Sequence, residues 1–183
     1  PIVRGIFSVS MSDNDDNGGW SIEEAKNLYN VHRWGADYFD INQAGHVVCR
    51  PLQAAGGEVA LNDIITEARK RGLKFPLLVR FQDILRHRVG VLNKAFQQAI
   101  REYEYQGTYR GVFPVKVNQL REVVEEILDA GRPYHFGLEV GSKPELLAGL
   151  ALQDADDGLI ICNGYKDPSF VHIALMGTKL GRE

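Results

Sequence analysis

The feature that most constrains the fold of this chain is a run of three strand-and-helix units after Gly107. Each unit begins with a short apolar run typical of a buried strand, and the three runs span 112–117, 136–140 and 158–162. A helix signal follows each run; the three signals are an apolar face closed by Gly131, the Ser142 cap with Glu145 three residues on, and Asp167 followed by Pro168. Successive units of this kind predict a parallel sheet with helices packed on it.

The short loops leave two parallel architectures open, a doubly wound sheet and a (β/α)₈ barrel. A barrel of the second kind takes about 250 residues, whereas only roughly seventy residues follow the start of the first strand in this series. The last helix, ending at 177–183, leads to no fourth strand. We therefore expect the chain to be truncated.

The residues before these units predict a leader and a first helix. Residues 11–19 are polar, acidic and end in glycine, so we expect a disordered leader over 1–20, within which Met11 is a candidate start. Ser21 and Glu24 have the spacing of a capping box. A short helix is expected to follow this cap.

Five further elements are expected before Gly107. Two β-prone runs, at 38–41 and 46–49, are separated by a four-residue loop and predict a hairpin. A helix is expected over 62–71 and a buried strand over 76–81. From Leu85, apolar residues recur at a spacing of three to four, which predicts a long amphipathic helix.

Composition indicates a globular protein and removes several classes of function. The chain is 44% apolar and 25% charged, and a net charge of −3 with a pI near 6.0 offers no clustered positive charge to nucleic acid or a membrane surface. Cys49 and Cys162 have no Cys or His neighbours at metal-ligand spacing. No apolar run is long enough to span a bilayer, and the first ten residues lack the pattern of a secretory signal. We therefore expect a cytoplasmic protein that binds neither nucleic acid nor a membrane.

In a parallel sheet, ligands bind beyond the carboxyl ends of the strands. The residues in such positions are Lys116, Asn118, Glu139, Ser142, Cys162 and Asn163. Lys116 differs from the others because its neighbours in sequence are apolar, which predicts an amine close to packed surface. Burial disfavours a charged amine, and a lysine that attacks a carbonyl must supply the neutral form. The alternative is a lysine that extends from the strand end to water without a chemical role.

Each of the other candidates also has a structural explanation. An N-cap role alone accounts for Ser142. Glu139 is expected to point inward near Lys116, where its carboxylate could exchange a proton with the amine, although a strand-end glutamate is also an ordinary finding. Cys162 is expected to be a small buried apolar side chain. No Walker A sequence, nucleophile elbow or glycine-rich nucleotide motif appears, and the five histidines have no metal or triad spacing.

Several segments together resemble one known family. The stretch 111–119, Gly-Val-Phe-Pro-Val-Lys-Val-Asn-Gln, is similar to the lysine-bearing strand of biosynthetic arginine decarboxylases. Residues 138–146 and 161–167 resemble that family's second and third barrel strands with their turns, and the aromatic segment 29–47 resembles its N-terminal region. The similarity covers about 28–183, in the expected order. The lysine motif alone would indicate only the wider alanine-racemase-like group.

The resemblance implies a fold, a reaction and a cofactor. The fold would be a (β/α)₈ TIM barrel of the alanine-racemase-like type with a β-rich domain, to which 21–106 contributes strands and a long helix, while 107–183 supplies the first three barrel units. The reaction would convert L-arginine to agmatine and carbon dioxide, in polyamine biosynthesis. Pyridoxal 5′-phosphate would be attached to Lys116 as a Schiff base and lined by Glu139 and Ser142. Magnesium is associated with the family, but no residue of the chain is identified as a metal ligand.

The resemblance also implies what the chain lacks. The family's stacking histidine, phosphate loop, acidic partner of the pyridine nitrogen and substrate-binding acids would lie beyond residue 183. In the wider group a second subunit completes the active site, so we expect a homo-oligomer in the full-length protein and an inactive chain in isolation. Two alternatives stay open: a related decarboxylase or racemase acting on ornithine, diaminopimelate or another amino acid, and a non-catalytic barrel relative with a binding or regulatory role.

Overall fold

The computed structural model describes residues 19–154 and 158–182, which form two compact units. Of these residues, the N-terminal unit comprises those up to Arg50 together with Glu58–Gly72, and the C-terminal unit comprises Pro51–Gly57 together with those from Leu73 onward. The leader predicted for 1–20 lies almost entirely outside the described residues. The domain division predicted at 106 and 107 stays a prediction.

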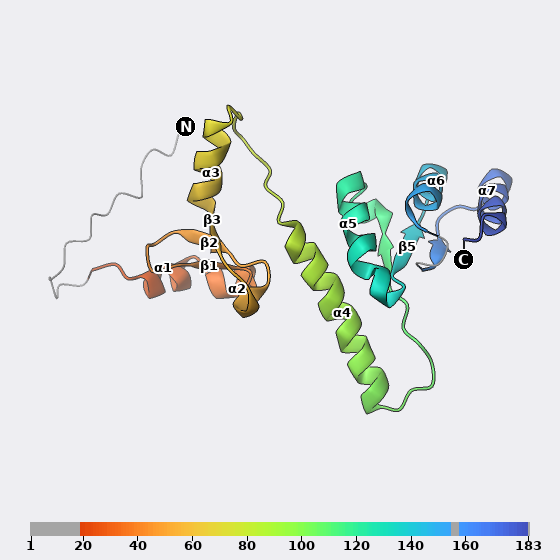
Figure 1. Cartoon of the computed structure of the whole chain (residues 1–183), viewed down its shortest axis with the longest axis horizontal. Helices are drawn as coiled ribbons and strands as arrows, with labels where there is room; N and C mark the ends of the chain where they lie inside the picture. Colours follow the sequence, from red (N-terminus) through yellow and green to blue (C-terminus); the bar gives the residue numbers. More distant parts are fainter. Residues whose placement is uncertain (1–18, 155–157, 183) are drawn as a thin grey trace. The chain divides into compact units, whose positions relative to one another are not determined.

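The N-terminal unit combines short helices with a small antiparallel sheet (Figure 1). Its elements are α1 (Ile22–Leu28), α2 (Val31–Gly35), β1 (Phe39–Ile41), β2 (Val47–Cys49), β3 (Val59–Ala60) and α3 (Leu61–Lys70). The capping box predicted at the start of α1 is confirmed, because Ser21 and Glu24 exchange both hydrogen bonds. The hairpin is also confirmed, with Phe39 opposite Cys49, although its loop extends through His46. Strand β3, which pairs with β2, was not predicted.

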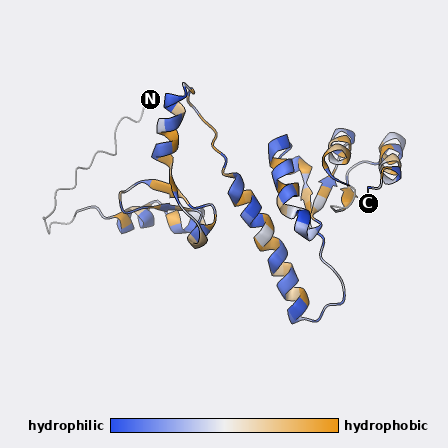
Figure 2. Cartoon of the chain, in the orientation of Figure 1, coloured by the Kyte–Doolittle hydropathy of each residue, from blue (hydrophilic) through white to orange (hydrophobic). Residues whose placement is uncertain are grey.

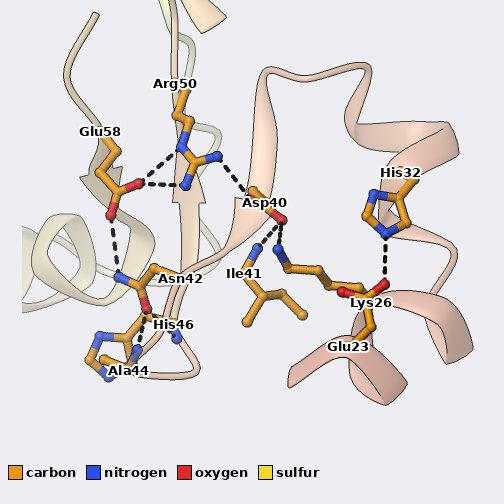
Figure 3. Close-up of polar contacts among 10 residues, drawn as sticks. All are labelled: Glu23, Lys26, His32, Asp40, Ile41, Asn42, Ala44, His46, Arg50 and Glu58. Carbon is orange, nitrogen blue, oxygen red and sulfur yellow. Dashed lines mark hydrogen bonds and ion pairs between the residues drawn. The ribbon is translucent and has the colours of Figure 1, made fainter. Parts of the chain in front are cut away.

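A chain of ion pairs on one side of this sheet joins α1 to the hairpin (Figure 3). The carboxylate of Asp40 lies 2.8 Å from the amine of Lys26 and 2.9 Å from the guanidinium of Arg50. Arg50 also reaches Glu58, at 2.8 Å, just before β3. Burial opposes the ionisation of Asp40, but the hydrogen bonds from Lys26 and the Ile41 N–H outweigh it, and the pKa of Asp40 lies below its usual range.

The C-terminal unit contains the predicted parallel sheet. Its elements are η1 (Gln53–Ala55), α4 (Gln82–Glu102), β4 (Val112–Pro114), η2 (Val115–Val117), α5 (Arg121–Gly131), η3 (Arg132–Tyr134), β5 (Gly137–Val140), α6 (Lys143–Leu152), β6 (Ile160–Cys162) and α7 (Pro168–Lys179). The sheet order is β4-β5-β6 and both pairings are parallel, which confirms the three strand-and-helix units. The three strands establish an α/β architecture.

The core of this unit lies between the sheet and its helices. Leu138 and Val140 of the central strand are fully buried, and they pack with Val124, Leu146 and Phe170 from the three helices that follow the strands. Helix α4 packs against α5, where Val89 meets Val123 and Ile127. Figure 2 shows hydrophilic and hydrophobic ribbon along both helices, as expected of amphipathic helices. This packing fixes the strand ends that carry the candidate residues.

The buried strand predicted for 76–81 is wrong. This segment is irregular and mostly exposed, and 79% of the surface of Leu78 is accessible. No strand among the described residues pairs with it, so its backbone groups lack the ladder that a strand requires. A short apolar run indicates a strand only if a partner is in place, and local sequence does not supply one.

The first strand of the parallel sheet is shorter than predicted, since β4 ends at Pro114 and 115–117 form a 3₁₀ turn. Proline has no N–H to donate to a continuing ladder. The turn is closed by a hydrogen bond from the Asn118 N–H to the carbonyl of Val115. Lys116 therefore lies on a turn beyond the strand, not on the strand itself.

Candidate functional site

The residues after the three parallel strands gather at one edge of the sheet. The turn η2 carries Lys116, and the turn between β5 and α6 carries Ser142. The backbone N–H of Asn163, just after β6, donates to the carbonyl of Val140 at 2.8 Å. Because the strands are parallel, their carboxyl ends meet on one side, where ligands bind in α/β proteins. The structure therefore confirms that these residues lie at the carboxyl edge of the parallel sheet, as predicted.

Lys116 and Glu139 form an ion pair at this edge. The Nζ of Lys116 lies 3.5 Å from Oε1 of Glu139. The lysine side chain is 59% exposed and the glutamate side chain only 9%. The expectation that Lys116 lies against packed surface is wrong, because the 3₁₀ turn directs Val115 into the core and leaves Lys116 and Val117 accessible. The expectation that Glu139 points inward near the amine is confirmed.

The second carboxylate oxygen of Glu139 has an unusual position. Oε2 is buried and has no hydrogen-bond partner among the residues that the structure describes. A buried oxygen that makes no hydrogen bond costs about 1–3 kcal/mol, so such atoms in native proteins call for an explanation. An incoming group that donates a hydrogen bond would satisfy this oxygen. The pair thus presents a reachable amine beside a fixed, partly unsatisfied carboxylate.

Ser142 caps α6, as its sequence position predicted. Its hydroxyl accepts a hydrogen bond from the N–H of Glu145 at 3.4 Å. The structural explanation for Ser142 is thereby confirmed, and a cofactor-lining role stays a prediction.

The carboxylate of Glu145 is a central element that sequence reasoning missed. Its Oε2 accepts from the Gly141 N–H at 2.7 Å and its Oε1 accepts from the Gln119 amide at 2.8 Å. The residue is 9% exposed. Capping-box spacing from Ser142 was the available signal, but it indicated a bond back to the cap residue and not a bridge to the turn after β4.

The loop after β6 is fixed to the loop after β5 by two further contacts. Lys143 forms an ion pair with Asp167, which also caps α7 through the Phe170 N–H. The hydrogen bond from Lys143 is the main cause that holds the pKa of Asp167 below its usual value. Gly164 has φ +74, and a side-chain carbon there would overlap the carbonyl oxygen of Gly141. These contacts keep the two turns close together.

The remaining candidates have local roles in the structure. The side-chain oxygen of Asn118 accepts from the Leu120 N–H at 3.1 Å, and that of Asn163 accepts from the Gly164 N–H at 2.8 Å. Cys162 is partly buried, and burial raises the pKa of its thiol. Asn118 and Asn163 thus shape the turns after β4 and β6.

Among residues 19–154 and 158–182, no three His, Cys, Asp or Glu side chains lie together in a way that could hold a metal ion. None of the helices in these same ranges is both long enough and apolar enough to cross a membrane.

Comparison with known proteins gives a consistent result, although no family model matches the chain. The biosynthetic arginine decarboxylase of Gloeobacter violaceus is 51% identical over 162 residues, which cover 88% of this chain and 25% of that protein. The enzyme of the same name from Parasynechococcus marenigrum is 48% identical over 168 residues, covering 92% and 26%. The chain is homologous to the biosynthetic arginine decarboxylases. It spans about a quarter of the length of the arginine decarboxylases it matches.

The fold agrees with this relationship. The crystal structure of the biosynthetic arginine decarboxylase of Campylobacter jejuni superposes with a TM-score of 0.76 at 32% identity, over 84% of this chain and 25% of that one. The resemblance to the arginine decarboxylases inferred from motifs is therefore confirmed by sequence and structure.

Proposed function

We propose that this chain supplies the lysine-bearing part of a pyridoxal-phosphate-dependent arginine decarboxylase, a carboxy-lyase that converts L-arginine to agmatine and carbon dioxide. The observation that carries the proposal is the accessible amine of Lys116 beside the buried carboxylate of Glu139, at the carboxyl edge of a parallel sheet, in a chain homologous to these enzymes. In this proposal the parallel sheet is the beginning of a (β/α)₈ barrel, and the hairpin of the N-terminal unit belongs to a β-rich domain.

The residues present fit attachment of the cofactor. A lysine that forms a covalent bond to an aldehyde must be reachable, and the Lys116 side chain is 59% exposed. The unsatisfied Oε2 of Glu139 offers an acceptor for a donor group brought into the site. When bound, pyridoxal phosphate would supply the electron sink for loss of the substrate carboxylate.

The chain's own residues would then have distinct tasks. Glu139 would hold the Lys116 amine at its Oε1 and exchange a proton with it. Ser142 would fix the start of α6, so that the turn after β5 lines the cofactor. The phosphate site and the substrate pocket would come from the three quarters of the arginine decarboxylases that this chain does not match. Residues 1–183 alone would accordingly be inactive.

The remaining parts of the proposal rest on the homology alone. The complete enzyme would be a cytoplasmic homo-oligomer with a role in polyamine biosynthesis. A requirement for magnesium is suggested only by the resemblance to the family, since no metal cluster is found among the described residues.

The proposal is tested on the complete protein that contains this chain. Incubation with pyridoxal phosphate should produce the visible absorbance band of a lysine-bound cofactor, and Lys116→Ala should abolish it. Lys94→Ala, which removes an exposed lysine on α4, is the matched control and should keep the band. A band that survives Lys116→Ala, or no band in the parent, contradicts the assignment. No band in the parent would favour a non-catalytic relative.

The substrate is tested separately by product analysis. L-arginine should release carbon dioxide and agmatine, whereas ornithine and diaminopimelate should compete poorly. Preferred turnover of either competitor would keep the cofactor chemistry and overturn the assignment to arginine.

A further inference from the structure

The carboxylate of Glu145 connects two segments that are far apart in the sequence. Through Oε1 it accepts from Gln119, three residues after Lys116, and through Oε2 it accepts from the N–H of Gly141, two residues after Glu139. Both segments that carry the Lys116 and Glu139 pair are therefore hydrogen-bonded, close to the pair, to the carboxylate of Glu145. The helix that supplies Glu145 is itself fixed in the core by Leu146.

The carboxylate that forms this bridge is buried. Glu145 is 9% exposed, and both of its donors are uncharged groups. Hydrogen bonds to an ionised acceptor are shorter and roughly twice as strong as those between neutral groups. Among the residues that the structure describes, no charged donor is recorded on this carboxylate. A buried carboxylate held by neutral donors is costly to place in a core, so its presence here calls for a role that an apolar side chain would not fill.

We propose that Glu145 is a positioning residue that holds the turn bearing Lys116 against the strand bearing Glu139, and so sets the distance between the amine and the carboxylate. Its importance for catalysis rests on the function proposed above, but the positioning itself does not require the cofactor. Because Glu145 positions the two segments through hydrogen bonds, a carboxamide in its place should hold them equally well. Its oxygen would accept from the Gly141 N–H, and its NH₂ would donate to the oxygen of a flipped Gln119 amide.

The test measures the reactivity of the Lys116 amine in the complete protein without cofactor. The rate of acetylation of Lys116 is read by mass spectrometry against the exposed Lys70 of α3 in the same molecules. Glu139→Gln sets the scale, because it removes the charged partner itself. Partly exposed ion pairs contribute roughly 0.2–1 kcal/mol, so loss of the pair should raise the relative rate by a factor of about 1.4 to 5.

Two variants break the bridge and two controls leave it intact. Glu145→Leu removes both bonds, and Gln119→Leu removes one from an exposed position where the fold is expected to tolerate the change. Both should raise the relative acetylation rate toward that of Glu139→Gln. Glu145→Gln should stay at the parent rate. Gln98→Leu removes an equivalent Gln-to-Glu bond, to Glu102 on α4, and should also stay at the parent rate.

The outcomes separate this inference from the proposed function. If Glu145→Leu and Gln119→Leu behave like Gln98→Leu, or if Glu139→Gln itself changes nothing, the positioning role is refuted. Addition of pyridoxal phosphate gives the second measurement: Glu145→Leu should weaken cofactor binding about tenfold, whereas Glu145→Gln should keep it. An altered acetylation pattern without any absorbance band in the parent would leave the positioning role intact and remove the decarboxylase assignment.

Discussion

The Nζ of Lys116 lies 3.5 Å from Oε1 of Glu139, and the two side chains have opposite exposure. The amine faces outward from a 3₁₀ turn, while the carboxylate is held in the core by the central strand of a parallel sheet. A fixed acceptor beside an exposed, reachable amine is the arrangement that a covalent attachment lysine requires, because the amine must leave the carboxylate in order to react.

This asymmetry predicts that Glu139 contributes more to chemistry than to stability. Glu139→Gln keeps the shape of the side chain and removes a long ion pair to an exposed partner, so the free energy of unfolding should change by no more than about 1 kcal/mol. Proton transfer by a positioned group contributes about 10²–10⁴-fold, so decarboxylation by the complete enzyme should fall by about a hundredfold or more. Urea unfolding and rate measurements on the same sample check both values. A large loss of stability with unchanged rate would contradict this division.

The close approach of the turns after β5 and β6 predicts a specific intolerance at Gly164. A side chain there meets the carbonyl oxygen of Gly141 in addition to a positive φ, so Gly164→Ala should cost more than the roughly 1–2 kcal/mol of the left-handed conformation. Gly45→Ala is the matched control, since Gly45 has φ +76 but nothing within 4 Å of an added carbon. Thermal unfolding compares the two variants. Equal costs would show that the contact between the turns is loose.

The packing of the central strand predicts a contrast between two leucines. Leu138 is fully buried between the sheet and its helices, so Leu138→Ala should lower the free energy of unfolding by about 2–5 kcal/mol. Leu78, in the segment wrongly predicted as a buried strand, is 79% exposed. Leu78→Ala should therefore change stability by less than about 0.5 kcal/mol. A large cost at Leu78 would mean that the segment is covered by another part of the complete protein.

The ion pairs of Asp40 predict an acid-sensitive N-terminal unit. Because the folded-state pKa of Asp40 is lowered, its contribution to stability is fully present above the unfolded value, which is about 3.9, and is lost as the pH falls through the folded value. Asp40→Asn should therefore be less stable than the parent at pH 7, and the difference should shrink below about pH 4. Unfolding titrations at several pH values provide the measurement. A difference between Asp40→Asn and the parent that stays the same at pH 3 as at pH 7 would contradict this prediction.

The outer strands of the parallel sheet predict self-association of residues 1–183 studied alone. Strands β4 and β6 lie at the two edges of the sheet in the described residues, and unpaired edges act as templates for further pairing. Sedimentation should show association that increases with concentration. Ile161→Lys, which places a charge on β6, should reduce it. A monomeric parent that melts cooperatively would refute this expectation.

Local sequence signals predicted those elements whose ends are decided by nearby residues. The caps at Ser21, Ser142 and Asp167 begin helices at the expected residues because the cap satisfies N–H groups only two or three positions away. The alternation of strands and helices likewise predicted the parallel sheet and its carboxyl edge, and hence the meeting of Lys116 with Glu139.

The sequence by itself therefore determined the order of strands and helices in the C-terminal unit and the candidate lysine. It also determined the relationship of the chain to the arginine decarboxylases. The tertiary structure decided what depends on distant partners: that 76–81 has no strand to pair with, that Lys116 is exposed, and that Glu145 bridges Gln119 and Gly141. The physical reason is the distance along the chain over which each kind of interaction acts. Caps and periodicity act over a few residues, whereas burial and the choice of a hydrogen-bond partner depend on segments that meet only when the chain has folded.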